Sequence, residues 1–67
     1  MKPARLRQAR LAAGLSLREL SEFLRQRGMQ LSHAALHKYE AGRARPAPRA
    51  LFLIAEAVGA PAHSFLR

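Results

Sequence analysis

The 67-residue chain contains no cysteine, no tryptophan and no aspartate. Without cysteine it can form neither a disulfide nor a thiolate metal site. No apolar run approaches the ~20 residues that span a membrane, and the N-terminus shows no signal-peptide pattern. Glutamate is the only acid, which leaves little for acid–base or nucleophilic chemistry. We therefore expect a cytoplasmic protein off the membrane that is not an enzyme, needs no cofactor and binds no small-molecule ligand.

Positive charge is what the chain has in excess. Twelve lysines and arginines face four glutamates, giving a net charge of +8. A charge of this size on so small a chain favours a polyanionic partner, usually nucleic acid. The alternative is a compositional bias, because ten of the twelve basic residues are arginine and alanine is frequent, as in proteins from GC-rich genomes.

Signals for helix starts and ends recur along the chain, and no strand-type alternation accompanies them. The clearest start is a capping box from Ser16 to Glu19. A glycine follows each of the first four helical segments, where a left-handed residue commonly ends a helix. The expected helices cover about residues 4–13, 17–27, 33–40, 48–58 and 60–66.

The third of these segments carries the most informative pattern. Ser32 is a good N-cap, and Gly42 supplies the stop. Helical spacing puts Leu36 and Tyr39 on one face, toward the core. The opposite face is short, polar and cationic and holds no acid, which suits insertion into a DNA major groove. Its residues are His33, Ala34, His37 and Lys38.

These pieces, in this order, resemble the lambda-repressor-like (Cro and phage-repressor) helix-turn-helix family over about residues 4–66. The matching residues are Leu6, Arg10, Gly14-Leu15-Ser16, Glu19-Leu20-Ser21, Leu24, Leu31-Ser32, Leu36, Tyr39-Glu40, Gly42, Pro46, Leu51, Leu53-Ile54-Ala55 and Val58-Gly59. The resemblance implies a compact all-α bundle of five helices in which helices 2 and 3 form the helix-turn-helix.

The chain departs from the family pattern between helices 2 and 3. Six residues separate Leu24 from Leu31, where the family usually has one. We expect an enlarged turn at about residues 25–31, formed either by a longer helix 2 or by a small basic loop. The family's usual glutamine at the start of helix 2, a phosphate contact, is Leu17 here, and Arg18 is the candidate to replace it.

The resemblance also implies an ion pair between Arg10 and Glu40. The residues agree with it, because each is a charge on an otherwise apolar helical face, where an unpaired charge is costly. The alternative is two separate, solvated charges.

If the chain binds DNA, two sets of residues are expected to contact it. The candidates for reading bases are the outward residues of the third helix, His33, Ala34, His37 and Lys38. The candidates for phosphate contacts are Arg18, Ser32, Arg43, Arg45 and Arg49. For each arginine the alternative is an ordinary solvated charge. We expect no metal site, because two histidines without a cysteine, an aspartate or a third nearby histidine make a poor ligand set.

The sequence as a whole therefore predicts that residues 1–67 form one domain that binds double-stranded DNA in sequence-specific transcriptional regulation, most simply repression. Such domains usually act as dimers on two half-sites. Leu53 and Leu66 form a candidate homodimer patch, unless both complete the core of the monomer. The sequence of residues 35–42 is also similar to that of regulators in which such a domain is fused to a metallopeptidase. This likeness would make the chain the N-terminal domain of a longer regulator.

A different class of function is compatible with the same fold. The chain could be a protein-interaction module, such as an antitoxin or a transcription bridging factor. Its interface would then use the apolar residues Phe23, Met29 and Leu53, and its basic face would be incidental.

Overall fold

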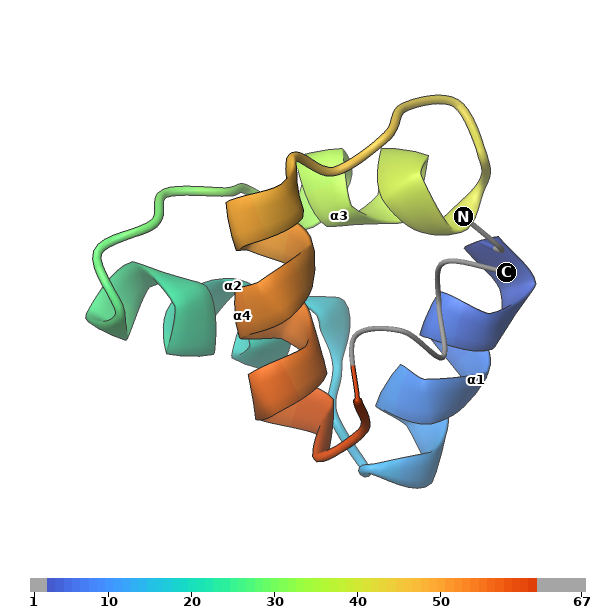
Figure 1. Cartoon of the computed structure of the whole chain (residues 1–67), viewed down its shortest axis with the longest axis horizontal. Helices are drawn as coiled ribbons and strands as arrows, with labels where there is room; N and C mark the ends of the chain where they lie inside the picture. The colour runs from blue at the N-terminus through green and yellow to red at the C-terminus, as the bar shows by residue number, and fades with distance from the viewer. Residues whose placement is uncertain (1–2, 62–67) are drawn as a thin grey trace.

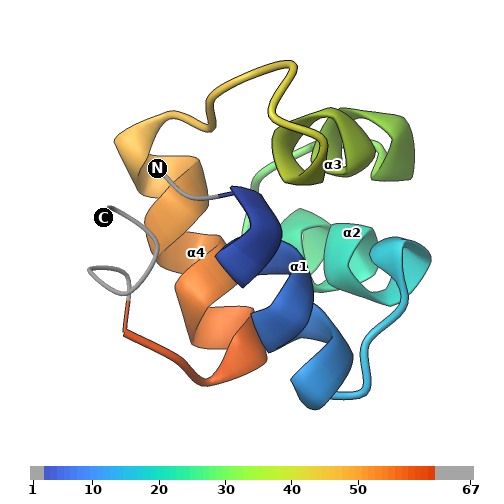
Figure 2. The ribbon, with the colours of Figure 1, turned by 90° about the vertical axis from the view of Figure 1, so that its right-hand side faces the viewer.

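The computed structural model describes residues 3–61, and this part of the chain folds into four α-helices. The helices are α1 (Pro3–Ala12), α2 (Leu17–Gln26), α3 (His33–Glu40) and α4 (Pro48–Val58). Both α3 and α4 pack against α1 and α2, but not against each other (Figure 1). The view turned by 90° separates them, with α4 at one side of the molecule and α3 at the other (Figure 2).

The prediction of five helices is wrong, although the all-α class is correct for residues 3–61. The expected last helix was to start at Ala60 and Pro61, but neither residue is helical. The backbone N–H of Ala60 donates to the carbonyl of Ala55, so Ala60 completes the end of α4. Its methyl side chain cannot cap a new helix either. The rest of the expected helix, residues 62–66, lies outside the described residues.

Local capping interactions determine where α2 and α3 begin. The Ser16 hydroxyl accepts a hydrogen bond from the Glu19 backbone N–H at 3.0 Å, and the Glu19 carboxylate accepts one from the Ser16 N–H at 2.9 Å. This is the reciprocal capping box that the sequence predicts. The Ser32 hydroxyl likewise accepts from the Ala35 N–H at 3.1 Å and caps α3. The structure thus confirms both predicted helix starts.

The end of α3 determines the path of the following loop. Gly42 has a φ of 75°, in the left-handed region that favours glycine. Its N–H donates to the carbonyl of Tyr39 at 3.2 Å, and the N–H of Arg43 donates to that of Lys38 at 2.9 Å. These two bonds form a Schellman motif, which turns the chain sharply away from the helix axis. The basic loop over residues 43–47 therefore starts in a defined direction.

The core draws at least one fully buried side chain from every helix. These side chains are Leu6, Leu20, Leu24, Leu36 and Ile54. Leu36 is the one buried residue of α3, and Tyr39 packs partly buried against the same core. None of the helices in residues 3–61 is long and apolar enough to cross a membrane.

The enlarged turn is a loop rather than an extension of α2. The helix ends at Gln26, and the connection to α3 runs over residues 27–32. Both ends of this loop are tied to α2. The N–H of Met29 donates to the Leu24 carbonyl at 2.9 Å, and the Ser21 hydroxyl donates to the carbonyl of Leu31. The extra residues therefore add a surface loop without releasing α3 from α2.

Candidate nucleic-acid interface

The outward face of α3 is accessible along its whole length. The side chains of His33, Ala34, His37 and Lys38 are all exposed, whereas Leu36 on the opposite face is 1% exposed. Helical periodicity alone separates these two faces, because residues three and four positions apart share a side. The face offers two imidazoles, one ammonium and one methyl group as contacts for a ligand.

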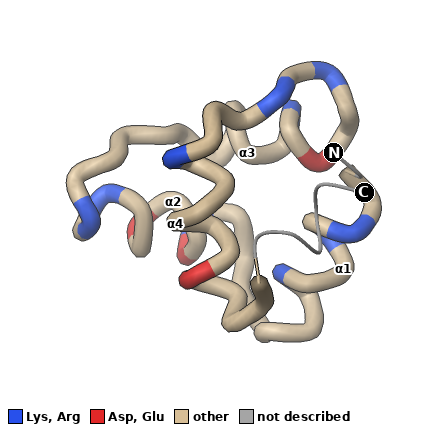
Figure 3. Tube along the Cα trace, viewed as in Figure 1, with Lys and Arg blue, Asp and Glu red and all other residues tan. Residues whose placement is uncertain are grey.

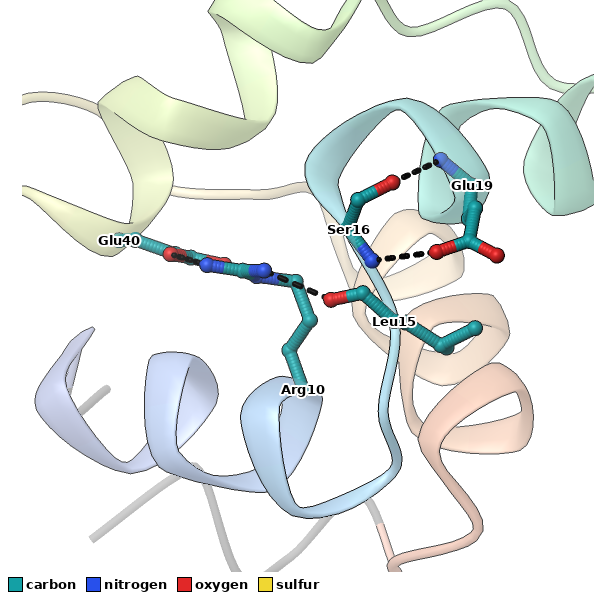
Figure 4. A network of polar contacts seen from close by, with 5 residues as sticks. All are labelled: Arg10, Leu15, Ser16, Glu19 and Glu40. Atoms are coloured by element: carbon teal, nitrogen blue, oxygen red, sulfur yellow. Dashed lines mark hydrogen bonds and ion pairs between the residues drawn. The ribbon is translucent and has the colours of Figure 1, made fainter.

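The one acid on α3, Glu40, is buried and paired. Arg10 of α1 donates from Nε to Oε2 of Glu40 at 2.6 Å and from Nη2 to Oε1 at 3.0 Å (Figure 4). This is the ion pair that the sequence predicts. Its side chains are only 9% and 5% exposed. The pair removes the negative charge of Glu40 from the reach of a polyanion beside α3.

The same guanidinium also contacts the entrance of α2. Arg10 Nη1 donates to the carbonyl oxygen of Leu15 at 2.7 Å, directly before the N-cap Ser16 (Figure 4). One side chain of α1 therefore links the end of α3 to the start of α2. Because each guanidinium nitrogen has an acceptor, the buried charge is hydrogen-bonded as burial requires.

Each of the four glutamates is engaged within residues 3–61. Glu22 pairs with Arg25, and Glu56 pairs with Arg27. Hydrogen bonding to the Ser16 backbone N–H holds the pKa of Glu19 below its usual value. The hydrogen bond from Arg25 does the same to the pKa of the Glu22 carboxyl. Both carboxyls therefore stay ionised at neutral pH, and the excess of basic side chains gives the domain its net positive charge.

The predicted phosphate contacts are all exposed and lie on α2, at the start of α3, on the loop after α3 and on α4. Arg43 and Arg45 lie on the loop between α3 and α4, and Arg49 is in the first turn of α4 (Figure 3). Arg18 is in the first turn of α2. Within residues 3–61, no hydrogen bond or ion pair engages these four guanidinium groups. Ser32 is exposed as well, and its hydroxyl hydrogen is still available for donation because the cap uses only its oxygen.

A hollow that the sequence did not reveal adjoins the outward face of α3. It has a volume of about 490 Å³ and lies between α1, the start of α2 and the end of α3. Its walls are formed by Arg7, Arg10, Leu17, His37, Glu40 and Ala41. Because Arg10 and Glu40 neutralise each other, the exposed Arg7 supplies the net positive charge of this hollow. The sequence held one hint of this hollow, because Arg7 lies one turn before Arg10 on the same helix.

Most of the apolar residues considered for partner binding pack inside the domain. Leu53, Phe23 and Met29 are half-buried and pack against the core. The guanidinium carbon of Arg27 also lies over the Phe23 ring, 4.7 Å from its centroid. Leu66, the second residue of the candidate dimer patch, lies outside the described residues. The apolar side chain that α4 does expose is Phe52, at 63%.

Metal ligands do not cluster in the described part of the chain. Over residues 3–61, no three side chains of histidine, cysteine, aspartate or glutamate come close enough together to hold a metal ion.

Comparison with known proteins identifies the family. The family model of a helix-turn-helix domain matches residues 4–65, almost the whole chain. Neither the curated proteins nor the solved structures gave a match. Domains of this kind are typically DNA-binding regulators without enzymatic activity. The chain belongs to the family of helix-turn-helix domains.

Proposed function

We propose that this chain is a lambda-repressor-like, sequence-specific regulator of transcription that binds double-stranded DNA and represses by occupying its operator. The observation that carries the proposal is the outward face of α3, which is exposed, cationic and free of acid because Glu40 is paired with Arg10. A helix of about 10–12 Å diameter fits the ~12 Å width of the major groove. In this proposal residues 1–67 form one DNA-binding domain, and α3 is its recognition helix.

The chemistry of each outward side chain suggests its contact in the groove. Lys38 can donate to guanine N7 and O6, and Ala34 can pack against a thymine methyl group. His33 can donate to a purine N7 or to a phosphate. His37 borders the hollow with Arg7, which favours a contact to the sugar–phosphate backbone. Because none of these residues makes the bidentate contact of arginine or glutamine with a base, the domain should discriminate between sequences only modestly.

The basic residues around α3 are proposed to position it on the duplex. They are Arg18, Arg43, Arg45 and Arg49, with Ser32 as an additional hydrogen-bond donor. Phosphate contacts fix the orientation of a protein on DNA without reading its sequence. If each of the four arginines neutralises one phosphate, the log–log slope of affinity against salt should be about −3.6.

An amide NMR titration with a short random-sequence duplex tests this proposal directly. At low salt we expect shifts concentrated at Arg18, over residues 32–38 and over residues 43–49, weakening as salt rises with the slope above. Shifts spread evenly over the chain, or an affinity insensitive to salt, would count against docking through α3. Selection of a preferred sequence from a random library would then address specificity.

The alternative of a protein-interaction module has less support. Its proposed contacts, Phe23, Met29 and Leu53, are half-buried and pack against the core, so they offer limited area to a partner. The same titration separates the two functions. If duplex DNA causes no shifts at any salt concentration, the DNA-binding proposal fails and a protein partner becomes the better explanation.

A further inference from the structure

The hollow at the end of α3 is continuous with the outward face of that helix. His37 belongs to both, because its exposed side chain lies on the outward face and also forms part of the wall of the hollow. A duplex that contacts the outward face therefore passes beside the hollow. The charged groups in the wall come within reach of its backbone.

Arg7 is the cation in the wall that has no partner inside the protein. The guanidinium of Arg10 is buried, and each of its nitrogens already donates to Glu40 or to the Leu15 carbonyl. Arg7 is exposed, and within residues 3–61 no hydrogen bond or ion pair engages its guanidinium. Its five N–H donors are therefore available to an anion from outside the domain.

The other wall residues place no uncompensated negative charge in the hollow. Glu40 is the one acid among them, and both of its carboxylate oxygens accept hydrogen bonds from Arg10. Leu17 and Ala41 contribute hydrocarbon atoms. The hollow therefore carries a net positive charge, that of Arg7. Its volume of about 490 Å³ lies in the range of small-ligand sites, which leaves room for a phosphate and an adjoining sugar.

The hollow and the basic loop lie on different sides of the end of α3. In Figure 2 the basic loop runs above the end of α3, whereas α1 and the start of α2 lie below it. Arg43 and Arg45 belong to the loop, and Arg7 belongs to α1. Phosphate contacts fix the orientation of a protein on DNA. Contacts on both sides of α3 would resist its rotation about its own axis in the groove, which contacts on one side do not.

We propose that Arg7 binds a backbone phosphate of double-stranded DNA in this hollow, with the imidazole of His37 as a second donor. This inference rests on the proposed function, and it adds α1 to the DNA interface. A single exposed guanidinium attracts a free anion only weakly in water. A duplex docked on α3 holds its phosphate beside Arg7, so the contact forms at a high effective concentration.

The salt dependence of DNA binding tests this contact. Arg7→Ala should weaken binding to the random-sequence duplex about five- to tenfold at about 0.1 M salt, because one phosphate fewer is neutralised. The magnitude of the log–log slope of affinity against salt should fall by about 0.9. Arg7→Lys keeps the charge and should retain the parent slope. A slope that is unchanged in Arg7→Ala would overturn the proposal.

Arg5 provides a matched control on the same helix. It is exposed and carries the same charge, but it lies about 200° around α1 from Arg7 and is not part of the wall. Arg5→Ala should therefore reduce the slope by less than half as much as Arg7→Ala does. Circular dichroism checks that both variants fold. Equal reductions would show that only the net charge of the domain matters, and would overturn the proposal.

The NMR titration gives a second readout at the hollow itself. With the duplex, the side-chain Nε–Hε signal of Arg7 and the signals of His37 should shift, whereas the Nε–Hε signal of Arg5 should not. An Arg7 signal that stays in place while α3 shifts would contradict the contact. Inorganic phosphate at the same phosphate concentration should leave Arg7 unchanged. A shift as large as that with the duplex would mean that a free anion fills the hollow, and would also overturn the proposal.

The outcomes distinguish this inference from the proposed function. A parent chain that binds the duplex with the same salt slope as Arg7→Ala refutes the Arg7 contact alone. A parent chain that does not bind the duplex even at low salt refutes the DNA-binding function, and this inference with it.

Discussion

Replacing Glu40 by glutamine should destabilise the domain strongly, because it leaves the Arg10 guanidinium buried beside a neutral partner. The substitution keeps the size and shape of the side chain and removes only its charge. The two native hydrogen bonds, at 2.6 and 3.0 Å, both end on carboxylate oxygens. The glutamine amide can accept one of them, but its NH₂ group faces a cation that needs an acceptor.

The expected magnitude follows from the burial of the pair. Removing one partner of a buried ion pair typically costs about 3–5 kcal/mol. Because Arg10 keeps its bond to the Leu15 carbonyl, and glutamine preserves one acceptor, we expect a loss of about 2–3 kcal/mol. A chain of this length has a total stability of about 3–10 kcal/mol. The melting temperature should fall by about 10–20 °C.

Urea denaturation followed by circular dichroism measures this loss, and the chain provides a matched control. Arg25 binds Glu22 through the same Nε and Nη2 geometry, but these side chains are 60% and 50% exposed. Glu22→Gln should therefore change the free energy of unfolding far less than Glu40→Gln does. Equal effects of the two substitutions, or a loss below about 1 kcal/mol for Glu40→Gln, would refute the argument from burial.

Three further expectations can be checked with similar variants. Arg43→Ala should weaken binding to a random-sequence duplex and reduce the magnitude of the log–log slope of affinity against salt by about 0.9. Arg25→Ala removes an equal charge that is already paired with Glu22, so it should change this slope little. Folding lowers the pKa of Glu19, so its capping contribution to stability is present above its unfolded-state pKa and is lost as the pH falls below 4.5. Glu19→Gln should therefore flatten the acid side of the stability–pH profile, which urea denaturation measures. Gly42→Ala should lower the free energy of unfolding by about 1–2 kcal/mol, because φ at this position is 75°. An unchanged melting temperature would show instead that the loop relaxes to accept alanine.

Much of the fold could be predicted because its signals are local. A capping box needs only Ser16 and Glu19, and a helix end needs only a residue such as Gly42 that tolerates a positive φ. Such signals act between residues a few positions apart, so no tertiary information is required. The fifth helix shows the limit of this reasoning. Its expected start at Ala60 and Pro61 has no side chain that could cap a helix. In the structure the N–H of Ala60 donates to the carbonyl of Ala55 in α4 instead.

The candidate site was predictable to the extent that it follows helix periodicity. The outward position of His33 and Lys38 depends only on their spacing along α3. The hollow beside Arg7 depends on how three helices meet, which the sequence does not specify. For Leu53 two places were left open, a patch for a second copy or the core of the monomer. In the structure Leu53 packs at the edge of the core, and Phe52 is the exposed large apolar residue of α4.

The Arg10 contacts explain how so short a helix can present a defined face. The apolar contacts of α3 come from the buried Leu36 and the partly buried Tyr39. Arg10 fixes the last residue of α3 through Glu40 and the entrance of α2 through Leu15, so the two helices are fixed relative to α1 by one rigid, planar group. A loss of this link should be felt most at the end of α3 that it holds. In the proposed complex that end carries Lys38, so weakening the link should impair base reading there before it impairs the phosphate contacts of the basic loop.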